Sequence, residues 1–154
     1  MIAKNKLHLR VRITTLVVIS CAILMLLPVI GEWILFSSAS SGNVSLTRRL
    51  IVCGVDPNTP RADRGNAVVR SAESGHLENL KILLMAGADP NSHTDTGRSA
   101  LMFAAENGHI EIVKLLINAG ANVNMSDGGG YTALSLAQGQ NEIISLIRLH
   151  SVKK

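Results

Sequence analysis

The stretch DTGRSALMFAAENGHIEIVKLLINAGANVN, residues 95–124, decides the fold. It holds two apolar segments of helical periodicity, separated by a Gly-His turn at residues 108–109. Ser99 can cap the first segment, because its hydroxyl can accept a hydrogen bond from a backbone N–H that the helix leaves unpaired. Gly120 follows the second segment, where glycine ends a helix at low conformational cost. The stretch therefore predicts two helices and a loop, a unit too small to bury its own apolar face.

Near copies of this unit lie on both sides of it. The strings GVDPN, GADPN and GANVN begin at Gly54, Gly87 and Gly120, which are equally spaced along the chain. The predicted helix caps Asn66, Ser99 and Thr132 follow the same spacing. Paired helices and a projecting loop with a period of about 33 residues are typical of ankyrin repeats. On these residues the chain resembles the ankyrin-repeat family over roughly residues 42–150.

This resemblance implies an all-α solenoid of about three helix–turn–helix–loop units. A degenerate N-terminal cap, with a helix expected at residues 44–53, precedes them. In the last unit the spacing shortens, since Glu142 follows the equivalent Glu111 sooner than the repeat period requires, and the closing helix is expected at residues 142–150. The family's first helix usually opens with Thr-Pro-Leu-His, and in this sequence only the capping residue and the apolar third position of that motif remain. We therefore expect a modestly stable domain at residues 42–150 with a solvated tail at residues 151–154.

The N-terminal part of the chain differs in character. Residues 1–12 carry Lys4, Lys6, Arg10 and Arg12, and residues 13–30 then run for 18 positions without a charge. A helix needs roughly 20 apolar residues to cross a bilayer. Residues 13–31 are therefore predicted as one hydrophobic transmembrane signal-anchor helix. Residues 32–41 are either a juxtamembrane linker or an atypical first helix of the solenoid.

Charge placement predicts an orientation for this segment. The four basic residues precede the span, and no basic residue follows it until Arg48, so the N-terminus is expected in the cytoplasm and the repeats across the membrane. Three alternatives stay open. Cleavage near Gly31 or Ser40 would release a secreted module, Cys21 could be a lipoprotein cysteine, and the segment could be a buried helix of a soluble protein.

Composition argues against several classes of function. The formal net charge is +4, and the four N-terminal basic residues supply all of it, so the remainder of the chain holds eleven basic and eleven acidic residues. A nucleic-acid-binding domain would normally carry a basic patch, and aromatic residues make up only 3% of the chain. We expect no nucleic acid partner and no small-molecule substrate.

We also expect no enzyme, metal or cofactor. His76 and His109 occupy the same turn one unit apart, where the family uses histidine structurally, and no Cys or carboxylate pair accompanies them at ligand spacing. Cys21 and Cys53 are interpreted as small buried apolar residues rather than as a disulfide. The Gly128–Gly130 string lacks the Lys-Ser/Thr that completes a phosphate-binding loop.

Binding of a protein partner is the remaining function. The resemblance implies that the loops and the exposed sides of the first helices form a concave face, which is how solenoids bind. Arginine and tyrosine are frequent binding anchors, and the apolar pair Met102-Phe103 stands out. The predicted partner-binding residues are Arg64, Val69, Arg70, Arg98, Met102, Phe103, Glu106, Tyr131 and Ser135.

Overall fold

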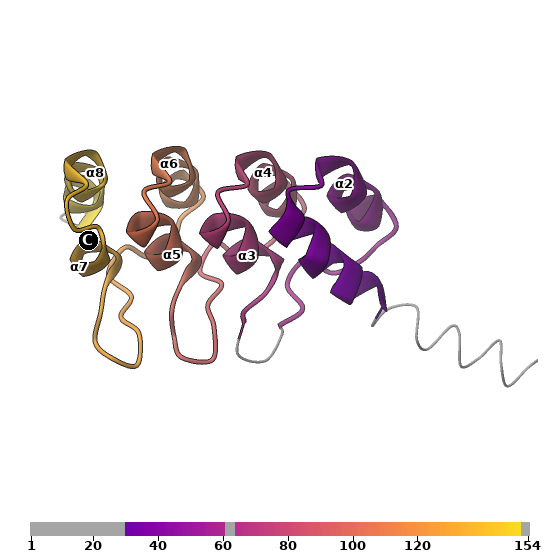
Figure 1. Cartoon of the computed structure of the whole chain (residues 1–154), viewed down its shortest axis with the longest axis horizontal. Coiled ribbons are helices and arrows are strands. Elements are labelled where there is room, and N and C mark those ends of the chain that lie inside the picture. Colours follow the sequence, from indigo (N-terminus) through magenta and orange to yellow (C-terminus); the bar gives the residue numbers. More distant parts are fainter. Residues whose placement is uncertain (1–29, 61–63, 152–154) are drawn as a thin grey trace, which may run out of the picture.

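The computed structural model describes residues 30–60 and 64–151. Helices lie in two rows, and long loops extend beyond one of them (Figure 1). The outer row holds α2 (Val44–Val52), α4 (Leu77–Met85), α6 (Ile110–Asn118) and α8 (Asn141–Ser151). The inner row holds α3 (Ala67–Glu73), α5 (Ala100–Glu106) and α7 (Ala133–Leu136), preceded by helical residues 30–41. In the part that the structure describes, the chain is a helical solenoid, as the repeat period predicts.

The predicted caps begin the inner helices. The Asn66 side chain accepts hydrogen bonds from the backbone of Val68 at 3.0 Å and of Val69 at 3.3 Å. Ser99 Oγ accepts from Met102 N at 3.2 Å, and Thr132 Oγ1 accepts from Ser135 N at the same distance. Each cap satisfies a donor that the first helical turn leaves without a partner. The three caps are therefore confirmed.

One continuous core joins the units, and the same positions recur in it. Leu80 and Leu83 of α4 are fully buried, as are their equivalents in α6 and in part those of α8. The units on either side cover this stripe between them, since a single helix pair cannot cover it. The equivalents that are buried in the later outer helices are Val113, Leu116 and Ile147.

Side-chain amides and imidazoles tie each unit to the preceding one. His76 Nε2 lies 3.0 Å from the carbonyl oxygen of Ser40, and His109 Nε2 lies 3.3 Å from that of Glu73. At the last junction Gln140 Nε2 donates to the carbonyl oxygen of Glu106 at 3.2 Å. The structural role expected for the two histidines is thus confirmed, and Gln140 takes over their position where the turn of the last unit is shortened.

The N-terminal end of the described solenoid begins with a helix. Residues 32–41 are helical, and Leu35 and Ala39 are buried, so this segment is a first helix rather than a linker. Helix α2 ends at Val52, and Cys53 is its C-cap. The expectation of a buried Cys53 is wrong, because its thiol is exposed at a C-cap position where Ala86 and Ala119 are exposed as well.

The predicted basic leader, most of the predicted membrane segment and the tail lie outside the described residues. Residues 30 and 31 continue directly into the first inner helix. Within residues 30–60 and 64–151, no helix combines the length and the apolar character that crossing a bilayer requires. Cys21 also falls outside the described part.

Candidate binding face

We define the inner face as the exposed sides of α3, α5 and α7 together with the loops that project beyond them (Figure 1). Successive units place Arg70, Phe103 and Leu136 at one position of this face, since each is one repeat period from the next. Glu73 and Glu106 occupy the position one helical turn later. The face is therefore built from a short set of residues that the repeat brings into line.

Arg70 lies in a polar cluster at the N-terminal half of the inner face. Its guanidinium forms an ion pair with Glu73 and donates to Ser40 Oγ at 3.2 Å. The same guanidinium lies 5.6 Å from the ring centroid of Phe36. A cation over an aromatic ring, held by a carboxylate, is an arrangement in which the charge is already compensated. Arg70 is thus fixed before any partner arrives.

Arg98 organises a second cluster, at the base of the projecting loop between α4 and α5; we call this loop and its equivalents before α3 and α7 the finger loops. Its guanidinium lies 4.5 Å from the ring centroid of Phe103 and forms an ion pair with Glu106. The side chain of Arg98 is 28% exposed and that of Glu106 is 44% exposed. The backbone N–H of Arg98 donates to Thr94 Oγ1 at 3.2 Å, a contact within the loop that closes its turn. The structure therefore brings three predicted site residues together into one half-exposed cluster.

Tyr131 lies at the end of the following finger loop. Its side chain is 56% exposed, and its backbone N–H donates to Asp127 Oδ1 at 2.9 Å. The two finger loops are joined, because Gly128 N donates to the carbonyl oxygen of Thr96 at 2.9 Å. The Tyr131 ring thus extends from a loop that is hydrogen-bonded to the loop carrying Arg98.

Two further predicted residues are accessible without joining a cluster. Ser135 is exposed, but its hydroxyl is engaged locally, because it accepts from Thr132 N and donates to the Thr132 carbonyl oxygen, each at 2.9 Å. Arg64 is exposed beside residues 61–63, which the structure does not describe.

The expectation that Val69 and Met102 lie on the exposed surface is wrong. Both side chains are fully buried. They occupy the third helical position, over which the returning finger loop packs. A Cβ added at Gly65 would lie 2.8 Å from Val69, and Met102 Sδ lies 3.4 Å from the backbone nitrogen of Ser99. These residues fix the loop to the helix and offer nothing to a partner.

The sequence interpretation also left three residues out of the site. Phe36 lies beneath Arg70, Glu73 pairs with it, and Leu136 continues the Phe103 position into the last unit. The repeat period was the signal that could have found Leu136. Phe36 precedes the clear repeats, so the period gave little guidance there.

On the outer row, an ion pair joins two neighbouring helices. Lys114 of α6 contacts Glu111 Oε1 at 3.0 Å within its helix and Glu142 Oε1 of α8 at 3.1 Å. Hydrogen bonds to Glu111 and then to Glu142 raise the pKa of Lys114 above its ordinary value of 10.5. Within the described residues, no group of three or more His, Cys, Asp or Glu side chains is arranged to hold a metal ion.

Comparison with known proteins identifies the repeat. A family model for ankyrin repeats, in three copies, matches residues 35–127 and residues 69–153. No curated protein matches the chain. The family match covers all of the helical units described above, including the first inner helix from Leu35 onward.

Proposed function

Because the chain belongs to the ankyrin-repeat family, whose members are generally non-enzymatic interaction modules, we propose that it is a membrane-anchored adaptor. It binds a protein partner through the concave inner face and the finger loops. The observation that most supports this binding face is the Arg98 cluster, in which Arg98, Phe103 and Glu106 are half-exposed and hold one another in place.

The chemistry of this cluster suits protein recognition. Arginine and tyrosine dominate the residues whose truncation weakens interfaces most, and rigid side chains lose little entropy on binding. Arg98 is held by Glu106 and by the Phe103 ring, while Tyr131 extends from an adjoining loop. Arg70 and Arg98 of the inner face are each paired with a carboxylate, which favours a partner that presents apolar and hydrogen-bonding groups over a highly charged one.

The anchoring part of the proposal rests on the sequence. Residues 13–31 serve as the transmembrane segment, the basic residues 1–12 stay in the cytoplasm, and the repeats lie outside it in a periplasmic, luminal or extracellular space. In the alternative, cleavage after this segment releases the same binding module as a secreted protein.

A matched pair of variants tests the binding face. The double variant Arg98→Ala/Tyr131→Ala of the full-length tagged chain is compared with Glu78→Ala/Lys81→Ala, which removes an exposed ion pair of the outer helix α4. Capture of cross-linked partners is quantified by mass spectrometry. We expect the inner-face variant to lose about 30-fold or more in affinity, the effect of removing a residue worth ~2 kcal/mol. The outer variant should bind normally.

Both variants should keep the helical circular dichroism of the parent chain. If a folded inner-face variant still captures the same partners, the face is wrongly assigned. Protease treatment of sealed cells or vesicles tests the anchor separately. A C-terminally tagged, full-length protein digested only from the non-cytoplasmic side supports it, and a shorter soluble product supports the secreted alternative.

A further inference from the structure

The loops after the outer helices are joined by a repeated asparagine contact. Asn58 Oδ1 accepts from the backbone nitrogen of Asp89 at 2.8 Å, and Asn58 Nδ2 donates to the carbonyl oxygen of Gly87 at 3.2 Å. One unit later, Asn91 Oδ1 accepts from the backbone nitrogen of Asn122 at 2.7 Å. In each case the asparagine of one unit holds the Gly-Ala-Asp/Asn turn of the next.

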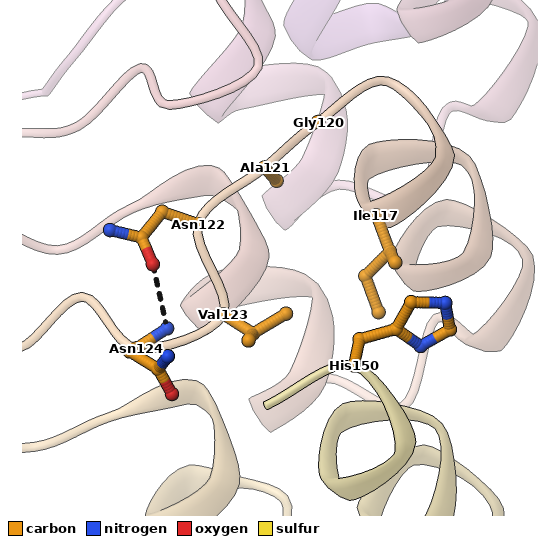
Figure 2. Close-up of a pocket in the computed structure, with 7 residues that line it drawn as sticks. All are labelled: Ile117, Gly120, Ala121, Asn122, Val123, Asn124 and His150. Atoms are coloured by element: carbon orange, nitrogen blue, oxygen red, sulfur yellow. Dashed lines mark hydrogen bonds between the residues drawn. The ribbon is translucent and has the colours of Figure 1, made fainter. Parts of the chain in front are cut away.

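Asn124 is the third residue of this series, and among the described residues no turn lies against its side chain. A cleft of about 240 Å³ opens there instead, between the turn after α6 and the end of α8. Figure 2 shows Asn124 and Asn122 on one side of it and His150 with Ile117 and Val123 on the other. The residues that line the cleft are Ile117, Gly120, Ala121, Asn122, Val123, Asn124 and His150.

As far as Ser151, the last residue that the structure describes, α8 does not make the turn that would fill this cleft. Helix α6 ends at Asn118, and Gly120 then turns the chain with a φ of 93°. The equivalent of Gly120 in the shortened last unit is Ser151, which still belongs to α8. A residue with a Cβ enters the left-handed region at a cost that glycine avoids. The last helix is therefore still helical at the position where the other units turn.

The apolar side of the last described unit that faces away from the stack is also less covered than in the earlier units. Leu134 of α7 and Ile144 of α8 are only half-buried. Their equivalents one unit earlier, Leu101 and Val113, are 1% and 0% exposed because the next unit covers them. Among the described residues, the outward side of the last unit is thus an unfilled junction rather than a polar cap.

The opposite end of the solenoid presents the complementary half of a junction. Leu46 and Leu50 of α2 are half-buried, whereas Leu83, the α4 equivalent of Leu50, is fully buried against the preceding unit. The backbone nitrogen of Asp56, equivalent to that of Asp89, has no partner among the described residues. Within the described part, the N-terminal, or upstream, surface therefore has a backbone donor without an acceptor, and the C-terminal, or downstream, surface has in Asn124 the acceptor that would receive it.

We infer that copies of this chain stack end to end, with the C-terminal unit of one copy seated on the N-terminal unit of the next. Asn124 of one copy receives the Gly54-Val55-Asp56 turn of its neighbour, and Leu134 and Ile144 lie against the neighbour's Leu46 and Leu50. The contact continues the junction that already joins the units within the chain. Because the two surfaces differ, the contact is head-to-tail and extends the inner face from one copy into the next.

The register provides a cross-linking test. Lys114 of α6 meets Glu142 of α8 at 3.1 Å, and the equivalent positions across the proposed contact are Ser145 of one copy and Ser45 of the next. Both serines are exposed. In a full-length background with Cys21→Ser and Cys53→Ser, Ser45→Cys and Ser145→Cys chains are prepared separately and mixed. A short bis-maleimide should give cross-linked dimers in the mixture and none with either variant alone.

Each other outcome contradicts the proposal in a distinct way. Dimers from Ser145→Cys alone would indicate that two C-terminal ends face one another. A folded mixture that gives no dimer would mean that the chains do not stack. Asn124→Ala should lower the dimer yield about two- to tenfold, the effect of one net hydrogen bond. Asn118→Ala, at the exposed end of α6, should leave it unchanged.

Discussion

His109 reaches back across one unit and places its Nε2 3.3 Å from the carbonyl oxygen of Glu73. The ring also lies against the turn of the preceding unit, since a Cβ added at Gly75 would come within 2.8 Å of it. One side chain thus satisfies a helix-terminal carbonyl and fills the junction. At the last junction Gln140 makes the same contact with Glu106, which shows that the amide can replace the imidazole there.

The variant His109→Ala should lower the free energy of unfolding by about 1–2 kcal/mol, through the lost hydrogen bond and lost packing. His109→Gln should recover part of this loss, because a glutamine already makes the equivalent contact at the following junction. Urea unfolding followed by circular dichroism measures both. The control is His93→Ala, because the ring of the exposed His93 has one hydrogen bond among the described residues, to the neighbouring Thr94 carbonyl oxygen at 2.9 Å. Equal losses for His93 and His109 would contradict the role of the junction.

Two methionines allow the stability effect of a buried side chain to be compared with that of an exposed one. Met102 is fully buried beneath a finger loop, and Met85 is 88% exposed at the end of α4. Met102→Ala should cost about 2–5 kcal/mol of stability, and Met85→Ala should change it by less than about 0.5 kcal/mol. Thermal and urea unfolding of both variants provide the measurement. A Met102→Ala variant of unchanged stability would contradict the burial of Met102 and favour its original assignment to the exposed surface.

Glycines at two helix ends test the close approach of the units. Gly75 has a φ of 79° and Gly54 a φ of 84°, so alanine at either position is strained by ~1–2 kcal/mol. Only at Gly75 would the added Cβ also meet His109, while nothing lies within 4 Å of it at Gly54. Gly75→Ala should therefore be the more destabilising variant in urea unfolding. Adding His109→Ala to it should cost less than the two single changes together.

Lys114 makes a pH-dependent contribution to the stability of the fold. Its hydrogen bonds to Glu111 and Glu142 raise its pKa, which means that the folded chain holds this proton more tightly than the unfolded chain. The stabilisation is complete below pH 10.5, the ordinary value, and is lost as the pH rises through the folded-state pKa. The difference in unfolding free energy between the parent chain and Lys114→Met should shrink over that alkaline range. A difference that stays constant there would contradict the assignment.

The repeat made most of the fold predictable. The repeat period located the caps Asn66, Ser99 and Thr132, because capping depends on residues close in the sequence. Helical periodicity located the buried stripes of α4 and α6 for the same reason. The role of Gln140 was harder to predict, since a deletion shifts the register at that turn and only the folded contact to Glu106 restores the equivalence.

The inner face was predicted less well than the fold. Arg98, Phe103 and Glu106 were each predicted on this face without any predicted contact, and the structure brings them together, while Val69 and Met102 were wrongly placed on the surface. Periodicity marks the face of a helix that meets other helices, but it does not report a loop that folds back over the third helical position. Burial by the finger loops is a tertiary effect. Whether the predicted residues bind a partner stays a prediction.

Helix α7 has four residues and buries only Ala133, whereas α5 has seven residues and buries five of them. Short helices with few buried side chains open at low free energy, so the end of the inner face that carries Tyr131 and Ser135 is the first to exchange its amide protons. A partner that contacts both residues also holds this helix closed. Part of its binding enthalpy and heat-capacity change then belongs to the ordering of the last unit, and the apparent affinity falls as temperature rises and α7 loosens.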